Sequence, residues 1–237
     1  MEERETYLVR VWLPDRPGAL GAVASRLGAL KGDVTGLEIV ERGGGQAIDE
    51  LVVSLPSNVD TDLVVREISA EEDVEVEEIV ALDGSPYDPQ LEALEAAAIV
   101  LGAESREELA EALVLHVCRA VRTSWACVLE RPSVEAAGNG RPSTVVAGWG
   151  DYPNDRWLDS FVSGSPAVNN DGPGLELDTV WIPLPAASSA LVVGRDGVLR
   201  ARERQRLAAL ARIADAWFRR LKEQSDRQAM MLHPSGR

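Results

Sequence analysis

The sequence predicts an α+β protein made of two domains, a linker and a tail. Residues 1–82 contain strand-like and helix-like patterns in the order strand, helix, strand, strand, helix, strand. Residues 83–88 are polar, contain turn-forming Gly and Pro, and mark a linker. Residues 89–224 combine long apolar helical stripes with short alternating runs, which predicts a central antiparallel sheet with flanking helices. Residues 225–237 are expected to form a flexible tail.

The chain begins with a strand that passes directly into a helix. Residues 6–13 alternate, with Arg10 and Trp12 on one face and an apolar set on the other: Tyr7, Val9, Val11 and Leu13. After Pro17-Gly18 the apolar spacing becomes helical, at Leu20, Val23, Ala24 and Leu27. The first N–H groups of such a helix have no partner within it. They suit an anionic group of a ligand, although a plain chain reversal gives the same pattern.

The rest of the first domain repeats these signals. Residues 34–41 and 47–55 predict two strands joined by the flexible loop RGGGQ. Residues 58–71 predict a helix with Asn or Asp caps. Residues 73–82 predict a last strand whose solvent-facing side chains are acidic. This order predicts the ferredoxin-like βαββαβ arrangement, in which one antiparallel sheet carries both helices on one face.

Two segments of this domain resemble the ACT family of amino-acid sensor modules: LPDRPGAL at 13–20 and GDVTGLEIVE at 32–41. The resemblance covers about residues 5–82. It implies an amino acid bound between two copies, with its carboxylate against the start of the first helix. The residues so implied are Asp15, Arg16, Gly18, Ala19, Leu20, Asp33 and Val34.

Asp33 departs from the Asn that many ligand-binding members of the family have at this place. An ionised Asp only accepts hydrogen bonds, so it favours a ligand ammonium and repels a carboxylate. Asp33 is expected near the same end of the sheet as the Pro17-Gly18 turn. The alternative is a domain that only dimerises, in which the turn serves strand-to-helix geometry. A nucleotide-binding loop is excluded, because the Gly-Lys-Ser/Thr ending is absent.

The second domain predicts two helices, a hairpin, a short helix, two more strands and a long closing helix. Ser105 and Glu108 form a capping box before the second of these helices. Trp125 and Cys127 lie on one face of the next strand, opposite Ala126 and Val128. The closing helix is expected from Val198 to about Gln224, with an apolar stripe facing inward: Leu199, Leu207, Leu210, Ile213, Ala214, Trp217 and Leu221.

Residues 89–224 resemble a GAF-like domain in their element order, their entry helix SREELAEALVLHVCRAV and their closing helix LAALARIADAW. This resemblance implies a small-molecule pocket or a dimerising spacer. A pocket would draw on the aromatic residues of the domain: Trp125, Trp149, Trp157 and Trp181. Core filling is the favoured interpretation of these tryptophans, and Trp149 and Trp157 are the best placed for a pocket. Cys127 is interpreted as a core residue rather than a chromophore anchor, and His116 as a packed or surface residue rather than a haem ligand.

Composition excludes several function classes. The formal net charge of −15 argues against nucleic acid and anionic lipid as partners, and the basic stretch Arg195–Lys222 is interpreted as a solvated helix face. Two cysteines and two histidines, His116 and His233, predict no metal site. No apolar run is long enough to span a membrane and the start is not that of a signal peptide, so a cytoplasmic protein is expected.

These observations predict a sensor that is not an enzyme. Neither a nucleophile with a base nor a paired-carboxylate site is visible, and no cofactor is expected. The expected ligand is an amino acid at the ACT-like domain, with a homodimer as the assembly and a further protein as the recipient of the signal. The alternatives are a scaffold that binds no ligand and a sensor whose ligand occupies the GAF-like domain.

Overall fold

The computed structural model describes residues 3–82, 88–132, 141–168 and 177–232. It divides the chain into two compact units, with the break between Asp88 and Pro89. Most of the expected linker, the centres of two expected loops and the residue His233 lie outside the described residues. Each unit has its own sheet and its own core.

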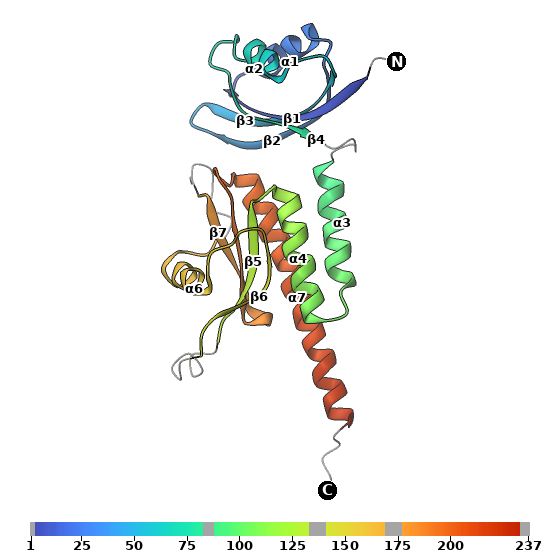
Figure 1. Ribbon diagram of the computed structural model, residues 1–237, viewed down its shortest axis with the longest axis vertical. Coiled ribbons are helices and arrows are strands. Elements are labelled where there is room, and N and C mark those ends of the chain that lie inside the picture. The colour runs from blue at the N-terminus through green and yellow to red at the C-terminus, as the bar shows by residue number, and fades with distance from the viewer. Residues whose placement is uncertain (1–2, 83–87, 133–140, 169–176, 233–237) are drawn as a thin grey trace. The chain divides into compact units, whose positions relative to one another are not determined.

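The first unit is an antiparallel four-stranded sheet with two helices on one face (Figure 1). Its elements follow in the order β1 (Arg4–Pro14), α1 (Ala19–Ala29), β2 (Asp33–Gly43), β3 (Gln46–Pro56), α2 (Thr61–Ile68) and β4 (Glu75–Leu82). The strand order across the sheet is β2-β3-β1-β4. The apolar face of β1 predicted from the sequence is buried against Val23 and Leu27 of α1 and Val64 and Ile68 of α2.

The opposite face of this sheet carries polar contacts between strands. Arg10 Nη2 lies 2.5 Å from Glu50 Oε1, and Trp12 Nε1 donates to Glu77 Oε2 at 2.5 Å. Arg10 and Trp12 therefore face away from the helices, as the alternation of β1 requires.

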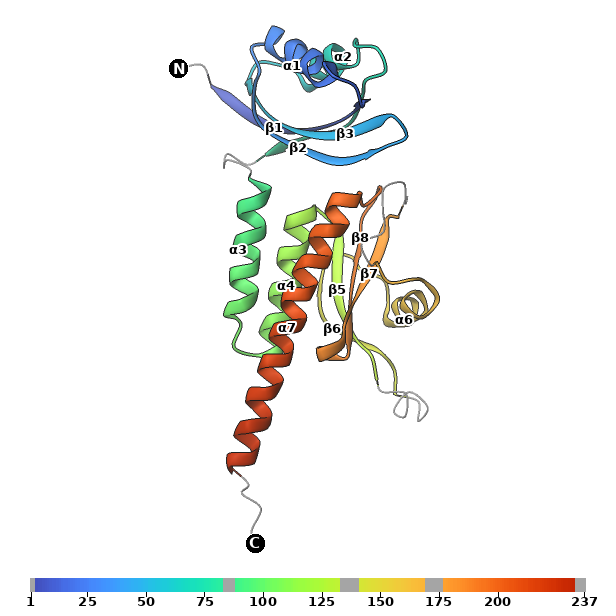
Figure 2. The same ribbon diagram turned by 180° about the vertical axis from the view of Figure 1, so that it is seen from behind.

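The second unit has a sheet of order β6-β5-β8-β7 between two helical layers. Its elements are α3 (Pro89–Gly102), α4 (Arg106–Val121), β5 (Trp125–Glu130), β6 (Thr144–Trp149), α6 (Asp155–Gly164), β7 (Thr179–Leu184), a 3₁₀ turn (Pro185–Ala187), β8 (Ser189–Gly194) and α7 (Ala201–Leu232). Figure 2 shows α3, α4 and α7 side by side, with α6 on the other side of the sheet.

Strand β5 shows how the two layers are specified. Its Ala126 and Val128 join the core shared with α4 and α7, whereas Cys127 and Leu129 join the core beneath α6. Each large apolar side chain buried in this way contributes roughly 1.5–3 kcal/mol to stability. The capping residue Ser105 accepts a hydrogen bond from the Glu108 N–H at 3.0 Å, so α4 begins where the capping signal placed it.

A buried ion pair joins three elements of the second unit. The Arg195 guanidinium donates to both carboxylate oxygens of Glu203, at 2.8 and 2.7 Å. It also donates to the main-chain oxygen of Val121 at the end of α4 and to that of Val198. The two side chains are 8 % and 7 % exposed. Arg195 therefore holds the end of α4, the residues after β8 and the start of α7 together.

The closing helix extends beyond the end expected from the sequence. It runs to Leu232, into the segment predicted as a flexible tail. The predicted end was near Gln224 because the apolar stripe of the helix stops at Leu221. The backbone nevertheless meets no Gly or Pro before Pro234, and Arg227 Nη2 lies 3.5 Å from Glu223 Oε2 one turn earlier.

Candidate functional site

The Pro17-Gly18 turn has a conformational reason for its glycine. Gly18 has φ +93° and caps α1 without a side-chain hydrogen bond. A residue with a Cβ rarely adopts this region, so the turn itself requires Gly. Asp15 and Arg16 are exposed, Ala19 is buried in the core and Leu20 is half-buried. The geometry of the strand-to-helix switch thus accounts for the motif without a ligand.

The structure places Asp33 away from this turn, which corrects the expectation that the two share one end of the sheet. Asp33 pairs with Ser54, whereas the Asp15 N–H donates to the Gly45 oxygen at 2.9 Å. The nine residues of β3 between these points span about 30 Å. Because β2 runs parallel to β1, its first residue lies at the opposite end from the loop after β1. Val34 is half-buried against the core beside Asp33. Within one copy, these residues do not form one site.

An acidic residue in the core of this unit was missed by the sequence analysis. Asp49 is 3 % exposed and pairs with Val11, so its side chain lies on the face covered by the helices. Its Oδ1 has no hydrogen-bond partner among the described residues. Burial raises the pKa of the carboxyl, while Arg42 lowers it and Asp15 raises it further. The sequence did contain an indication of this position, because Asp49 lies two residues from both Ala47 and Leu51 and so shares their face of the strand.

Replacing Asp49 by asparagine is expected to stabilise the chain at neutral pH. The pKa of the carboxyl is higher in the folded state than in the unfolded state, so the wild type loses stability as pH rises through the folded-state pKa. The amide of the variant does not titrate. The advantage of Asp49→Asn should therefore be small at acidic pH and grow toward neutrality, as measured by urea unfolding at several pH values.

The matched control for this variant is Asp33→Asn, which changes an exposed carboxyl at the start of β2 in the same sheet. It is expected to change the free energy of unfolding by less than about 0.5 kcal/mol, because the side chain is exposed. A destabilised Asp49→Asn protein at pH 7 would show instead that the carboxylate has a partner essential to the fold.

The four tryptophans proposed for a pocket do not come together. Trp125 and Trp181 pack on the core beneath α6, and Trp181 Nε1 donates to the Ser165 oxygen at 3.1 Å. Trp157 stacks on Phe161 of the same helix, with ring centroids 5.2 Å apart, and is 44 % exposed. Trp149 pairs with Ala126, so it projects from the sheet face that α4 and α7 cover, and is 46 % exposed.

A cavity of about 230 Å³ lies elsewhere in the second unit, between the sheet and the helices α4 and α7. Its apolar lining is formed by Ala110, Val128, Val146, Ala187 and Phe218. Ala110, Val128 and Phe218 are buried members of the main core. None of the four tryptophans lines it. Its residues come from distant parts of the sequence, so no local motif could have indicated it.

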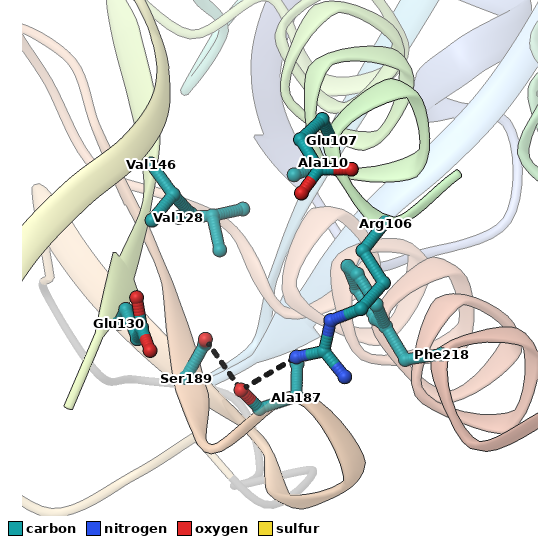
Figure 3. Close-up of a pocket in the computed structure, with 9 residues that line it drawn as sticks. All are labelled: Arg106, Glu107, Ala110, Val128, Glu130, Val146, Ala187, Ser189 and Phe218. Atoms are coloured by element: carbon teal, nitrogen blue, oxygen red, sulfur yellow. Dashed lines mark hydrogen bonds between the residues drawn. The ribbon is translucent and has the colours of Figure 1, made fainter. Parts of the chain in front are cut away.

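Three charged side chains and one hydroxyl complete the lining (Figure 3): Arg106, Glu107, Glu130 and Ser189. Arg106 Nη2 donates to the Ala187 oxygen at 3.2 Å, and the Ser189 hydroxyl donates to the same oxygen at 3.1 Å. The Arg106 guanidinium carbon lies 5.6 Å from the centroid of the Phe218 ring, within cation–π range. Arg106 is thus held in place while presenting further N–H donors.

The two carboxylates reach the cavity from different elements. Glu107 belongs to the first turn of α4, and Glu130 is the last residue of β5. Glu130 Oε1 has a distant cationic neighbour, Arg141 Nη2, at 3.9 Å. The cavity therefore offers a guanidinium, two carboxylates, a hydroxyl and an apolar wall within one small volume.

The three described cysteine and histidine side chains, Cys118, Cys127 and His116, are not part of the cavity lining. Burial raises the pKa of the Cys127 thiol to about 12 and also raises that of Cys118, so both thiols are neutral at physiological pH. Burial and the neighbouring Arg119 lower the pKa of His116. No group of three or more His, Cys, Asp or Glu residues in the described part of the chain could hold a metal ion. No described helix is long and apolar enough to cross a membrane.

No protein-family model and no curated protein matches this chain. Among solved structures, the GAF domain of a putative sensor histidine kinase from Pseudomonas syringae pv. tomato is similar over 60 % of this chain and 92 % of its own, with 16 % identity and a TM-score of 0.41. The photosensory core module of the Stigmatella aurantiaca phytochrome is similar over 82 % of this chain and 44 % of its own, with 13 % identity and a TM-score of 0.42.

A formyltetrahydrofolate deformylase from Pseudomonas putida KT2440 is similar over 38 % of this chain and 36 % of its own, with 17 % identity and a TM-score of 0.28. Likenesses at this level establish no family and carry no function over to this chain.

Proposed function

We propose that this chain is a non-catalytic sensor that binds a small zwitterion, such as an amino acid, in the cavity lined by Arg106, Glu107 and Glu130. The observation that carries the proposal is the combination of one guanidinium, two carboxylates and an apolar wall around a space of about 230 Å³. That volume is below the roughly 300–1,000 Å³ of pockets for drug-sized ligands, so it suits a small metabolite.

The charges define how such a ligand would lie. A guanidinium recognises a carboxylate through two parallel hydrogen bonds, so the ligand carboxylate would face Arg106. A ligand ammonium would then face Glu107 and Glu130, whose carboxylates accept hydrogen bonds. The apolar part would lie against Val128, Val146 and Phe218. A purely anionic ligand would meet two carboxylates, and a purely cationic one would meet the guanidinium.

The non-catalytic part of the proposal rests on the chemistry of these groups. The guanidinium of Arg106 carries N–H donors and no acceptor, so it is not a general base. Ser189 has its hydroxyl bonded to a main-chain oxygen, and among the described residues no histidine or cysteine lines the cavity to activate it.

A thermal-shift screen of the twenty amino acids and simple amines tests the proposal. A ligand that binds only the folded state stabilises it by RT ln(1 + [L]/Kd), about 2.7 kcal/mol at a hundredfold excess over Kd. We expect a stabilising zwitterion whose effect is lost in Arg106→Met and retained in Arg156→Met, an arginine on α6 that does not line the cavity. A blank screen would favour the scaffold without a ligand.

A second candidate site is the loop after β1 in the first unit. We propose it because the segments at 13–20 and 32–41 resemble an ACT domain and because the order β2-β3-β1-β4 suits a ferredoxin-like module. The specific observation is Asp49, whose buried Oδ1 has no described partner and whose pKa is affected by Asp15 of that loop. A ligand ammonium would satisfy this carboxyl. Loss of a screen hit in Asp49→Asn, with Arg106→Met unaffected, would favour this site.

A further inference from the structure

The cavity of the second unit has an excess of carboxylate over guanidinium in its lining. Its charged residues are Arg106, Glu107 and Glu130, so the lining carries one formal positive and two formal negative charges. An amino acid with an uncharged side chain has one group of each sign. After its carboxylate meets the guanidinium and its ammonium meets one carboxylate, the second carboxylate has no cation in the ligand. Removing a carboxylate from water costs free energy unless a cation compensates it, so the excess selects among zwitterions.

The protein itself compensates this excess only weakly. The Glu107 side chain makes no hydrogen bond and no ion pair with the residues that the structure describes. Glu130 has one cation near it, Arg141, whose Nη2 lies 3.9 Å from Oε1. That separation exceeds hydrogen-bond distance, and the Arg141 and Glu130 side chains are 66 % and 43 % exposed, so their pairing contributes little. Arg141 is also not part of the cavity lining.

The two carboxylates reach the cavity from different sides (Figure 3). Glu107 follows Arg106 in the first turn of α4, whereas Glu130 ends β5 on the sheet side of the cavity. Val128 lies two residues before Glu130 and therefore on the same face of the strand, where it forms an apolar wall that leads to this carboxylate. The cavity thus has a guanidinium and one carboxylate on the helix, and a second carboxylate at the end of an apolar wall.

We propose that the ligand of this cavity is an amino acid with a second ammonium group at the end of an aliphatic side chain, an inference that rests on the proposed function of the cavity. Ornithine and lysine represent this class. The α-carboxylate faces Arg106 and the α-ammonium faces Glu107, since both residues belong to one helical turn and both ligand groups share one carbon. The methylene groups pack along Val128 and Val146, and the distal ammonium faces Glu130. Each charge of the ligand then meets one opposite charge of the lining.

Two matched pairs of ligands test the distal ammonium: ornithine against norvaline, and lysine against norleucine. The members of each pair have the same carbon skeleton and differ only in that group. In calorimetry with the full chain, we expect the diamino acid of the tighter-binding pair to bind roughly tenfold more tightly than its partner. This is the lower end of the range for a hydrogen bond to a charged group, because Glu130 is partly exposed. Equal affinities within both pairs would overturn the inference.

Carboxylate variants assign the two ammonium groups. Glu130→Gln should lose the roughly tenfold preference within a pair but keep the affinity for the uncharged partner, which also shows that the variant is folded. Glu107→Gln should weaken the binding of both members. The control is Glu111→Gln, an exposed residue of α4 that does not line the cavity, which should bind like the wild type. A preference that persists in Glu130→Gln contradicts the proposed place of the distal ammonium.

The same measurements separate this inference from the proposed function. If norvaline or norleucine binds as tightly as its diamino partner and loses affinity in Arg106→Met, the cavity binds zwitterions but does not select a second ammonium. If none of the four compounds binds, the inference is wrong, and the screen of the other amino acids decides on the proposed function. If a diamino acid binds and Arg106→Met has no effect, both the cavity assignment and this inference are wrong.

Discussion

Replacing Arg195 by methionine is expected to lower the free energy of unfolding by about 3–5 kcal/mol, because the change removes the guanidinium from a buried ion pair with Glu203. The two side chains are almost fully buried and joined by two hydrogen bonds. The change also removes the donor to Val121 at the end of α4. Urea unfolding followed by tryptophan fluorescence reports on this unit, because five of the six tryptophans belong to it.

Two further variants separate the ion pair from simple loss of packing. The pair variant Arg195→Met with Glu203→Leu removes both charges and should recover much of the lost stability. Arg219→Met removes a largely exposed arginine that pairs with Asp215 one turn away, and should cost less than about 1 kcal/mol. If Arg195→Met lowered the free energy of unfolding no more than Arg219→Met, the Arg195–Glu203 ion pair would not hold α4 and α7 together.

Replacing Gly150 by alanine is expected to cost about 2–4 kcal/mol, through backbone strain and a collision with the main chain. Gly150 follows β6 with φ +73°, and an added Cβ would lie 2.2 Å from the Ser124 oxygen. This neighbour is backbone, so it moves only if the loop before β5 moves with it.

Gly197→Ala is the matched control in the same unit. Gly197 also has a positive φ, +101°, but an added Cβ would meet no atom within 4 Å. It should therefore show the strain alone, about 1–2 kcal/mol. Equal losses in the two variants would mean that the loop before β5 yields to the new methyl group.

The elements with their own periodicity could be predicted from the sequence. Residues 6–13 and 125–130 alternate cleanly, and both lie in strands whose faces are those expected. The end of α7 was missed for the opposite reason. Its last turns have no apolar stripe facing their own core, so their helical state has no signal in the hydrophobic pattern.

The candidate sites were harder to predict, for two physical reasons. Asp33 was misplaced because spacing along the chain does not show which end of a sheet a strand begins at, whereas the pairing with Ser54 does. The cavity could not be found because Arg106, Glu130 and Phe218 meet only after α4, β5 and α7 pack together. Asp49 could have been noticed, because it alternates with the apolar Ala47 and Leu51 and therefore lies on the buried face of its strand.

The most direct test of the proposed sensor is calorimetry with the best amino acid from the screen and the amine that lacks its carboxylate. If Arg106 binds that carboxylate, the wild type should prefer the amino acid by roughly 10- to 100-fold, the range of a hydrogen bond to a charged group. Arg106→Met should lose this preference and bind both compounds with similar Kd, while Arg156→Met should keep it. An undiminished preference in Arg106→Met would contradict the assignment of this cavity as the binding site.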